Sequence, residues 1–149
     1  MCIIVDTNRM SEFLCSQKKE DVAPIHQWLK KRHGFLIYST GDKFSDEVKH
    51  KARKILQQFM NAGYAKLVPS HEFIEDAKSL RENATVKSDD YHVLALARAT
   101  SARILFTSDK NLIKDFTNKT LVDNPRGKIY SGKQNRKELL QNWRCSSSV

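Results

Sequence analysis

Short apolar runs alternate along the chain with amphipathic segments whose apolar residues recur every three or four positions. Four apolar runs predict buried strands, at residues 2–5, 35–38, 65–68 and 103–107. The amphipathic segments between them predict helices, the longest of which carries apolar residues from Phe44 to Met60. Residues 121–122 are expected to add an edge strand. This alternation favours an α/β fold, a mainly parallel central sheet of four or five strands with helices on both faces.

The chain has 149 residues, enough for one domain with a substantial core. We see no repeat and no long linker, so we expect a single domain over residues 1–149. Residues 126–149 form a basic C-terminal extension of that domain, with a basic helix expected over 133–144. No apolar run approaches the roughly 20 residues needed to cross a bilayer, and the segment before Asp6 is too short for a signal peptide. We therefore expect a cytoplasmic protein with no membrane partner.

The net charge of the chain is +9, which favours polyanions, most often nucleic acid, as binding partners. Candidate contacts to a phosphate backbone are Lys43, Lys49, Lys110 and Arg126. The alternative is that these cations only keep the surface solvated, and for any single one of them that alternative is favoured.

Four acidic residues are each expected at the same edge of the sheet. Asp6 directly follows the first strand, and Glu47 lies near the start of the helix after the second. Asp90 opens an apolar helix, and Asp109 follows the strand at 103–107. The carboxyl ends of parallel strands meet at the edge where ligands usually bind. For Asp6, Asp90 and Asp109, each taken alone, the alternative is a helix-capping role.

Carboxylates gathered at one edge repel each other unless a hard cation binds among them. Mg²⁺ and Mn²⁺ prefer such oxygen ligands. Metal ions held in this way lower the pKa of a bound water and stabilise charge that develops on a phosphate. The acids therefore favour metal-dependent phosphodiester chemistry, which needs no histidine or serine nucleophile.

Three segments resemble motifs of the PIN-domain nucleases. Ile3-Ile4-Val5-Asp6-Thr7-Asn8 resembles their opening motif, residues 90–97 resemble their third acidic motif, and Thr107-Ser108-Asp109 resembles their T-x-D motif. The resemblance covers roughly residues 2–122. It implies a PIN-like three-layer α/β/α sandwich, one or two Mg²⁺ or Mn²⁺ ions, and hydrolysis of RNA phosphodiester bonds.

The resemblance also implies roles for individual residues. Asp6, Asp90 and Asp109 match the acidic positions, with Asn8, Thr107 and Asp89 in support. The second acid of the family follows the second strand, where Glu47 fits best and Asp42 and Asp46 stay open. Many single-domain members are toxins paired with an antitoxin, so an antitoxin protein and a second copy of the chain are open as partners. Residues 124–130 and the basic helix lie beyond the core motifs.

Three other classes of protein are alternatives to a PIN-like nuclease. A haloacid-dehalogenase-like phosphatase, which has a Rossmann-like fold, carries a second acid two residues after its first aspartate, where this chain has Asn8. A Rossmann-type nucleotide-binding protein needs a glycine-rich turn after the first strand, and none of the five glycines lies there. A non-catalytic nucleic-acid-binding module stays open, and it is distinguished by having no carboxylate-dependent affinity for Mn²⁺.

Overall fold

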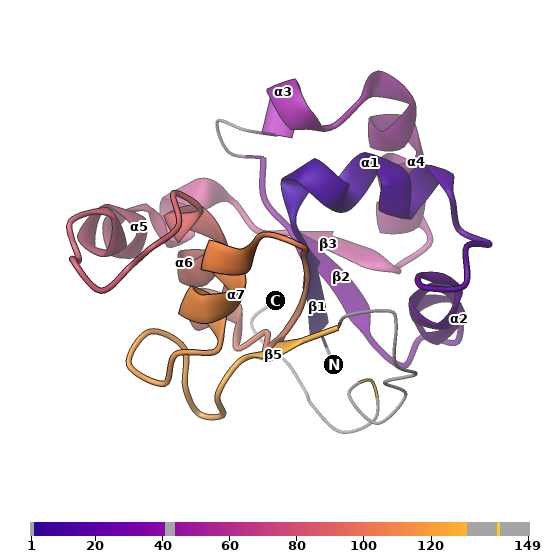
Figure 1. Ribbon diagram of the computed structural model, residues 1–149. Coiled ribbons are helices and arrows are strands. Elements are labelled where there is room, and N and C mark those ends of the chain that lie inside the picture. The colour runs from indigo at the N-terminus through magenta and orange to yellow at the C-terminus, as the bar shows by residue number, and fades with distance from the viewer. Residues whose placement is uncertain (1, 41–43, 131–139, 141–149) are drawn as a thin grey trace.

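The fold is built on a parallel sheet of five strands (Figure 1). The structure, a computed structural model, describes residues 2–40, 44–130 and 140, without the side chains of 45 and 46. The strand order is β3-β2-β1-β4-β5, and every neighbouring pair is parallel. The strands are β1 (Cys2–Val5), β2 (Phe35–Tyr38), β3 (Ala65–Leu67), β4 (Ile104–Phe106) and β5 (Lys128–Ile129). The predicted α/β fold with a mainly parallel sheet is confirmed.

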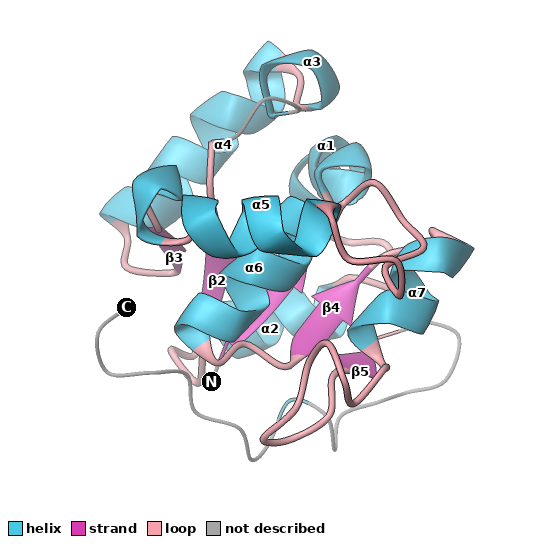
Figure 2. Cartoon of the chain, turned by 90° about the vertical axis from the view of Figure 1, so that its left-hand side faces the viewer, coloured by secondary structure: helices cyan, strands magenta, loops and turns pink. Residues whose placement is uncertain are grey.

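Helices cover both faces of this sheet. On one face lie α1 (Thr7–Cys15), α2 (Ala23–Lys30) and α4 (His50–Asn61), with the single turn α3 (Phe44–Glu47) beside α1. On the other lie the 3₁₀ turn η1 (Ser70–Glu72), α5 (Ile74–Arg81), α6 (Tyr91–Thr100) and α7 (Lys110–Phe116). Figure 2 views the molecule from the side of α5 and α6, with the sheet behind them. The three layers form an α/β/α sandwich.

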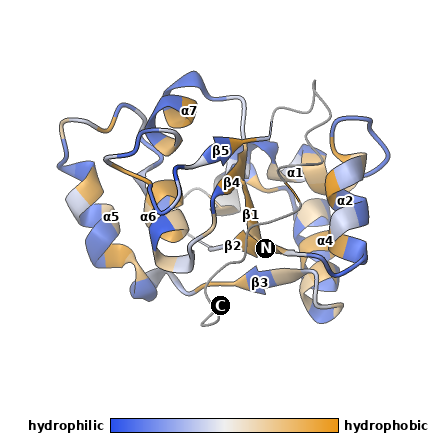
Figure 3. Cartoon of the chain, turned by 90° about the horizontal axis from the view of Figure 1, so that it is seen from below, coloured by the Kyte–Doolittle hydropathy of each residue, from blue (hydrophilic) through white to orange (hydrophobic). Residues whose placement is uncertain are grey.

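Alternation along the central strand explains why the sheet is buried on both sides. Ile3 and Val5 point into the core beneath α1, α2 and α4, whereas Cys2 and Ile4 point into the core beneath α5, α6 and α7. Successive strand residues face opposite sides, so a strand covered on both faces is apolar throughout. Figure 3 shows the central strands as predominantly hydrophobic, between helices that carry both hydrophobic and hydrophilic stretches.

The edge strand lies elsewhere than predicted. Leu121 and Val122 are buried in a turn, where they fill the core beneath α7 without pairing in the sheet. The edge strand is instead β5, where Lys128 N–H donates to the Arg103 carbonyl at 2.8 Å. Gly127 directly precedes β5 and approaches Phe116 so closely that a Cβ would clash with the Phe116 carbonyl and ring. The apolar character of Leu121 and Val122 therefore correctly indicated that they are buried, but not whether they pair with a strand of the sheet.

The long amphipathic segment from Phe44 onward is two helices rather than one. Lys49 adopts an extended conformation with φ −64° and ψ 152°, which separates α3 from α4. Both Phe44 and Val48 are still buried, so the apolar spacing continues across the break. The break leaves Glu47 at the end of a single turn instead of inside a long helix. The basic helix expected over 133–144 lies outside the described residues apart from Leu140, which is buried.

Within the described ranges, no helix is both long and apolar enough to cross a bilayer.

A buried histidine gives the fold a pH dependence. His26 stacks on Phe13 with ring centroids 4.3 Å apart and meets the edge of Phe59 at 5.6 Å. Its Nε2 lies 2.8 Å from the Phe13 carbonyl oxygen, while Nδ1 is buried with no hydrogen-bond partner among the described residues. Burial lowers the pKa of His26 from 6.5 to about 4. A neutral His26 is therefore part of the folded core.

We expect acid to destabilise the protein through this side chain. Below pH 6.5 the unfolded chain binds a proton at His26 that the folded chain accepts only near pH 4. The neutral His26 side chain therefore makes its full contribution to the free energy of unfolding above pH 6.5. That free energy falls by about 3 kcal/mol on acidification toward pH 4. Urea unfolding of the wild type and of His26→Gln between these pH values measures the difference. His33→Gln changes an exposed histidine and should keep the wild-type dependence of the unfolding free energy on pH. If His26→Gln also kept that dependence, His26 would not be its source.

Candidate functional site

The strand order reverses at β1, and the carboxyl ends of the strands at that point form the crevice where α/β proteins bind ligands. From β1 the chain adds β2 and β3 on one side, then β4 and β5 on the other. Asp6 follows β1, and Thr107 follows β4. The Thr107 hydroxyl donates to Asp6 Oδ2 at 2.7 Å, and Asp6 N–H donates to the Phe106 carbonyl at 3.0 Å. These bonds fix Asp6 at the reversal point.

The Asp6 carboxylate is buried, with only 1% of the residue exposed. Asp6 occupies the N-cap position of α1, and Thr7 and Asn8 lie inside that helix. No described lysine or arginine forms an ion pair with Asp6. Burial raises the pKa of Asp6, and the negative charges of Asp90 and Glu47 raise it further. The Thr107 hydroxyl and the backbone N–H of Asn8 oppose the rise. Asp6 therefore lies in a negative environment that favours a cation.

Glu47 is held on the site by α1. The Thr7 hydroxyl donates to the Glu47 carboxylate. Ser11 Oγ donates to the Glu47 carbonyl at 3.4 Å and accepts from the Lys49 N–H at 2.9 Å. Thr7 and Ser11 are four residues apart, so they lie on the same face of α1. From the sequence, Thr7 is a candidate helix cap and Ser11 has no assigned role, although their spacing directly after Asp6 was a signal that they could act together.

Asp90 is placed by a buried acid that sequence reasoning also missed. Asp90 is 9% exposed and precedes α6, and its N–H donates to Ser88 Oγ at 3.2 Å. The Asp115 carboxylate accepts from the backbone N–H groups of Lys87 at 2.9 Å and Ser88 at 2.8 Å. Asp115 interrupts the apolar face that Leu112 and Phe116 form on α7. An acid within an apolar helix face was the available signal. The neighbouring Asp89 is exposed.

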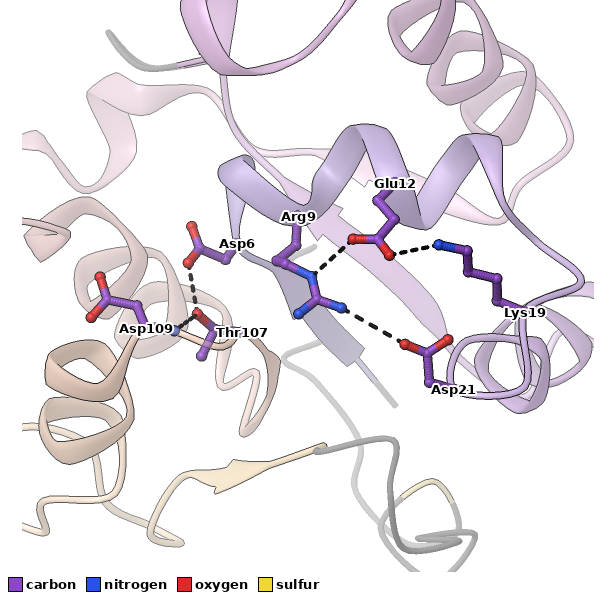
Figure 4. A network of polar contacts seen from close by, with 7 residues as sticks. All are labelled: Asp6, Arg9, Glu12, Lys19, Asp21, Thr107 and Asp109. Atoms are coloured by element: carbon purple, nitrogen blue, oxygen red, sulfur yellow. Dashed lines mark hydrogen bonds and ion pairs between the residues drawn. The ribbon is translucent and has the colours of Figure 1, made fainter.

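Asp109 has a capping role. Its Oδ1 accepts from the backbone N–H groups of Asn111 at 2.9 Å and Leu112 at 3.2 Å, which caps α7. Figure 4 shows the Thr107 hydroxyl between the Asp6 carboxylate and the backbone nitrogen of Asp109, which donates to it at 3.1 Å. Asp109 is thus joined to Asp6 through Thr107. The carboxylates whose negative charge acts on Asp6 are those of Asp90 and Glu47.

The remaining predicted residues are at the surface or outside the description. Asn8, Lys49, Lys110 and Arg126 are exposed. Arg126 Nε donates to the Thr117 carbonyl at 2.6 Å, which holds it to the end of α7. Asp42, Lys43 and the side chain of Asp46 lie outside the described part, so the choice of second acid between them and Glu47 stays untested.

A separate ionic network lies along α1, beside the Asp6 carboxylate (Figure 4). Arg9 lies 3.5 Å from Glu12 and 3.8 Å from Asp21, with its guanidinium 4.6 Å from the centre of the Phe106 ring. Lys19 pairs with Glu12 at 3.0 Å, and the pKa of Glu12 is lowered by this bond and by Arg9. Glu12 thus has two cationic partners, in contrast to the Asp6 carboxylate.

The carboxylates around Asp6 fit a divalent metal ion in their chemistry, but not in their present arrangement. Carboxylate oxygens are the ligands that Mg²⁺ and Mn²⁺ prefer, and burial together with the charges of Asp90 and Glu47 disfavours an ionised Asp6 carboxylate that has no cation beside it. In the part of the chain that is described, no three histidine, cysteine, aspartate or glutamate side chains are arranged to hold one ion as they stand. The chemistry of the donors fits, and their rotamers would have to change, above all at Glu47, which is bonded to Thr7.

Comparison of the chain with models of known protein families, with curated proteins and with solved structures finds no match.

Proposed function

We propose that this protein is a Mg²⁺- or Mn²⁺-dependent endoribonuclease that hydrolyses RNA phosphodiester bonds at the carboxyl edge of its sheet. The observation that carries the proposal is the buried Asp6 carboxylate, which lies at the reversal point of the strand order with two further carboxylates near it. The resemblance of the motifs around Asp6, Asp90 and Asp109 to those of PIN-domain nucleases supports RNA as the substrate. The net charge of +9 supports a polyanion.

Each residue of the site has a separate task in this proposal. Asp6, Asp90 and Glu47 supply oxygen donors, and Thr107 orients Asp6 through its hydrogen bond. Thr7 orients the Glu47 carboxylate on α3 through its hydrogen bond. A divalent ion bound to these donors would lower the pKa of a bound water and stabilise the charge that develops on the phosphate. Asp109 stabilises the start of α7 through Oδ1, is joined to Asp6 through Thr107, and stays a predicted further oxygen donor.

The partners and location of the protein are part of the same proposal. An antitoxin protein and a second copy of the chain are partner hypotheses that depend on the resemblance alone. A cytoplasmic location is the corresponding hypothesis for where the protein acts.

The proposal is tested by incubating the purified chain with a single-stranded RNA labelled at both ends. We expect internal cleavage with Mn²⁺ or Mg²⁺ and none with EDTA. Cleavage that persists in EDTA would contradict a metal-dependent mechanism. Binding without cleavage under every metal condition would favour the non-catalytic nucleic-acid-binding module instead.

The basic start of α4 should contribute to RNA binding. Lys49 and Lys51 are exposed and follow Glu47 closely in the chain. Each phosphate contact with a single strand adds about 0.7 to the slope of log affinity against log salt. Replacing both lysines with glutamine should therefore weaken binding and reduce that slope by about 1.4. Filter binding with an RNA in EDTA, at several salt concentrations, measures the slope.

A matched control for this prediction lies at the opposite edge of the sheet. Lys30 and Lys31 are exposed and precede β2, so they lie at the amino ends of the strands. Replacing them with glutamine removes the same charge and should leave the slope much closer to that of the wild type. An equal loss of RNA affinity and of its salt dependence in the two double variants would mean that RNA binding depends only on the net charge of the protein.

A further inference from the structure

A pocket of about 180 Å³ opens beside the acidic residues, between the carboxyl ends of β1 and β2 and the helices on both faces. Its lining is mainly apolar and includes Ile4, Ile37, Phe44, Phe73, Val93 and Leu96. Thr7 and Asp90, which belong to the acidic site, also line it. A ligand in the pocket therefore lies directly next to the proposed reaction centre.

Two features of the lining would be stabilised by a bound ligand. Ser39 lines the pocket, and its hydroxyl is buried with no hydrogen-bond partner among the described residues. A buried hydroxyl without a partner is unfavourable, so such groups usually receive one from a bound molecule. Ile74, also in the lining, is 40% exposed, one of two large apolar side chains exposed to this extent in the described part of the chain. A molecule in the pocket would cover Ile74, and a turn of the Ser39 side chain toward that molecule would give its hydroxyl a partner.

We propose that the pocket binds one unstacked base of an RNA strand whose adjacent phosphate lies at Asp6, Asp90 and Glu47. The inference rests on the proposed function, since it assumes that an RNA strand crosses the acidic site. Bases that leave a stack are bound between aromatic and apolar side chains, with a few polar groups at their edges. Tyr38 and Phe44 provide such surfaces, with nearly parallel rings whose centroids are 6.2 Å apart.

A base fits this pocket better than an apolar side chain of a partner protein. An apolar side chain would cover Ile74 but would leave the Ser39 hydroxyl without a hydrogen bond. The edge of a base offers a donor or an acceptor, and a serine hydroxyl can serve either. For the same reason Ser39 does not distinguish one base from another. We therefore expect the pocket to select bases by size and stacking, with only a modest preference in sequence.

The inference is tested by NMR of the methyl groups of the full chain, in EDTA so that no cleavage occurs. The probes are adenosine 5′-monophosphate, uridine 5′-monophosphate and ribose 5-phosphate, which lacks a base. We expect the methyl signals of Ile74, Val93 and Leu96 to shift with at least one nucleotide and not with ribose 5-phosphate. Equal shifts with ribose 5-phosphate, or no shift at these methyls with either nucleotide, would overturn the inference.

Two variants and a control sharpen the test. Val93→Phe fills the pocket from α6 and should weaken nucleotide binding at least 10-fold. Ala99→Phe adds the same ring at an exposed position of α6 and should leave binding unchanged. Ser39→Ala is small enough to keep the fold and should weaken binding about 5-fold, as expected for one hydrogen bond. Wild-type affinity in Ser39→Ala and Val93→Phe alike would place the nucleotide elsewhere and overturn the inference.

A final arm distinguishes the other occupant. N-acetyl-leucine methylamide mimics an apolar side chain of a partner protein. Shifts of the pocket methyls with this probe, and none with the nucleotides, would assign the pocket to a protein partner and overturn the inference. Because the measurement needs neither metal nor cleavage, its outcome is separate from that of the proposed function. Nucleotide binding by a chain that cuts no RNA would support the base-binding pocket and refute the proposed nuclease. RNA cleavage by a chain whose pocket methyl signals do not shift with nucleotides would support the nuclease and refute the base-binding pocket.

Discussion

Replacing Asp6 with asparagine should reduce RNA cleavage on the order of 10³-fold or more, because essential groups of an active site typically contribute that much. The substitution is nearly isosteric, and the asparagine amide oxygen can still accept the Thr107 hydroxyl. The fold should therefore remain intact. In the absence of metal it should become more stable, because burial and the charges of Asp90 and Glu47 disfavour the ionised Asp6 carboxylate.

The control for this variant removes a carboxylate from the surface. Glu20 is exposed in the segment between α1 and α2, and Glu20→Gln makes the same change of carboxylate to amide. Single-turnover cleavage of one RNA by wild type, Asp6→Asn and Glu20→Gln gives the comparison. Wild-type cleavage by Asp6→Asn would rule out the proposed role of this residue, whatever the other variants do.

The second large effect is on thermal stability. An ion that binds only the folded chain stabilises it by about 4 kcal/mol when its concentration is 1,000 times the dissociation constant. For a domain of this size that corresponds to a rise of roughly 10 °C in the melting temperature. We expect Mn²⁺ to produce such a rise in the wild type and a much smaller one in Asp6→Asn.

This prediction includes a reversal of order. Without metal, Asp6→Asn should melt above the wild type, because a disfavoured charge has been removed. With saturating Mn²⁺, the wild type should melt above Asp6→Asn, because the ion compensates that charge. Calorimetric scans in EDTA and across a Mn²⁺ titration show whether the order reverses. Equal stabilisation of the two proteins by Mn²⁺ would place the ion elsewhere.

The main strands could be predicted because their signals are local. The runs Cys2–Val5 and Phe35–Tyr38 became strands with the predicted bounds, since each is apolar throughout and followed by polar residues. The edge strand β5 has only two residues, one of them the exposed Lys128, so no apolar run in the sequence predicted it. The break at Lys49 was also hidden, because Phe44 and Val48 keep helical apolar spacing while the backbone is extended.

The candidate site was predictable as far as strand ends determine it. Asp6 and Thr107 follow strands that become neighbours, so the parallel sheet itself brings them together. Asp109 has capping partners within three residues, and the sequence alone could not decide between this local role and a ligand role. The contacts of Thr7 and Asp115 join segments 40 and 28 residues apart, which only the tertiary structure reveals.

The most direct test of the central claim is where a divalent ion binds. Mn²⁺ is paramagnetic, so it broadens the backbone amide signals of residues close to it. We predict that low Mn²⁺ concentrations broaden the amides of Asp6, Thr7, Glu47 and Asp90 first, and that Asp6→Asn abolishes this broadening. Broadening that begins at surface acids such as Glu75 or Glu82, or that is unchanged in Asp6→Asn, would contradict a metal site at this edge of the sheet.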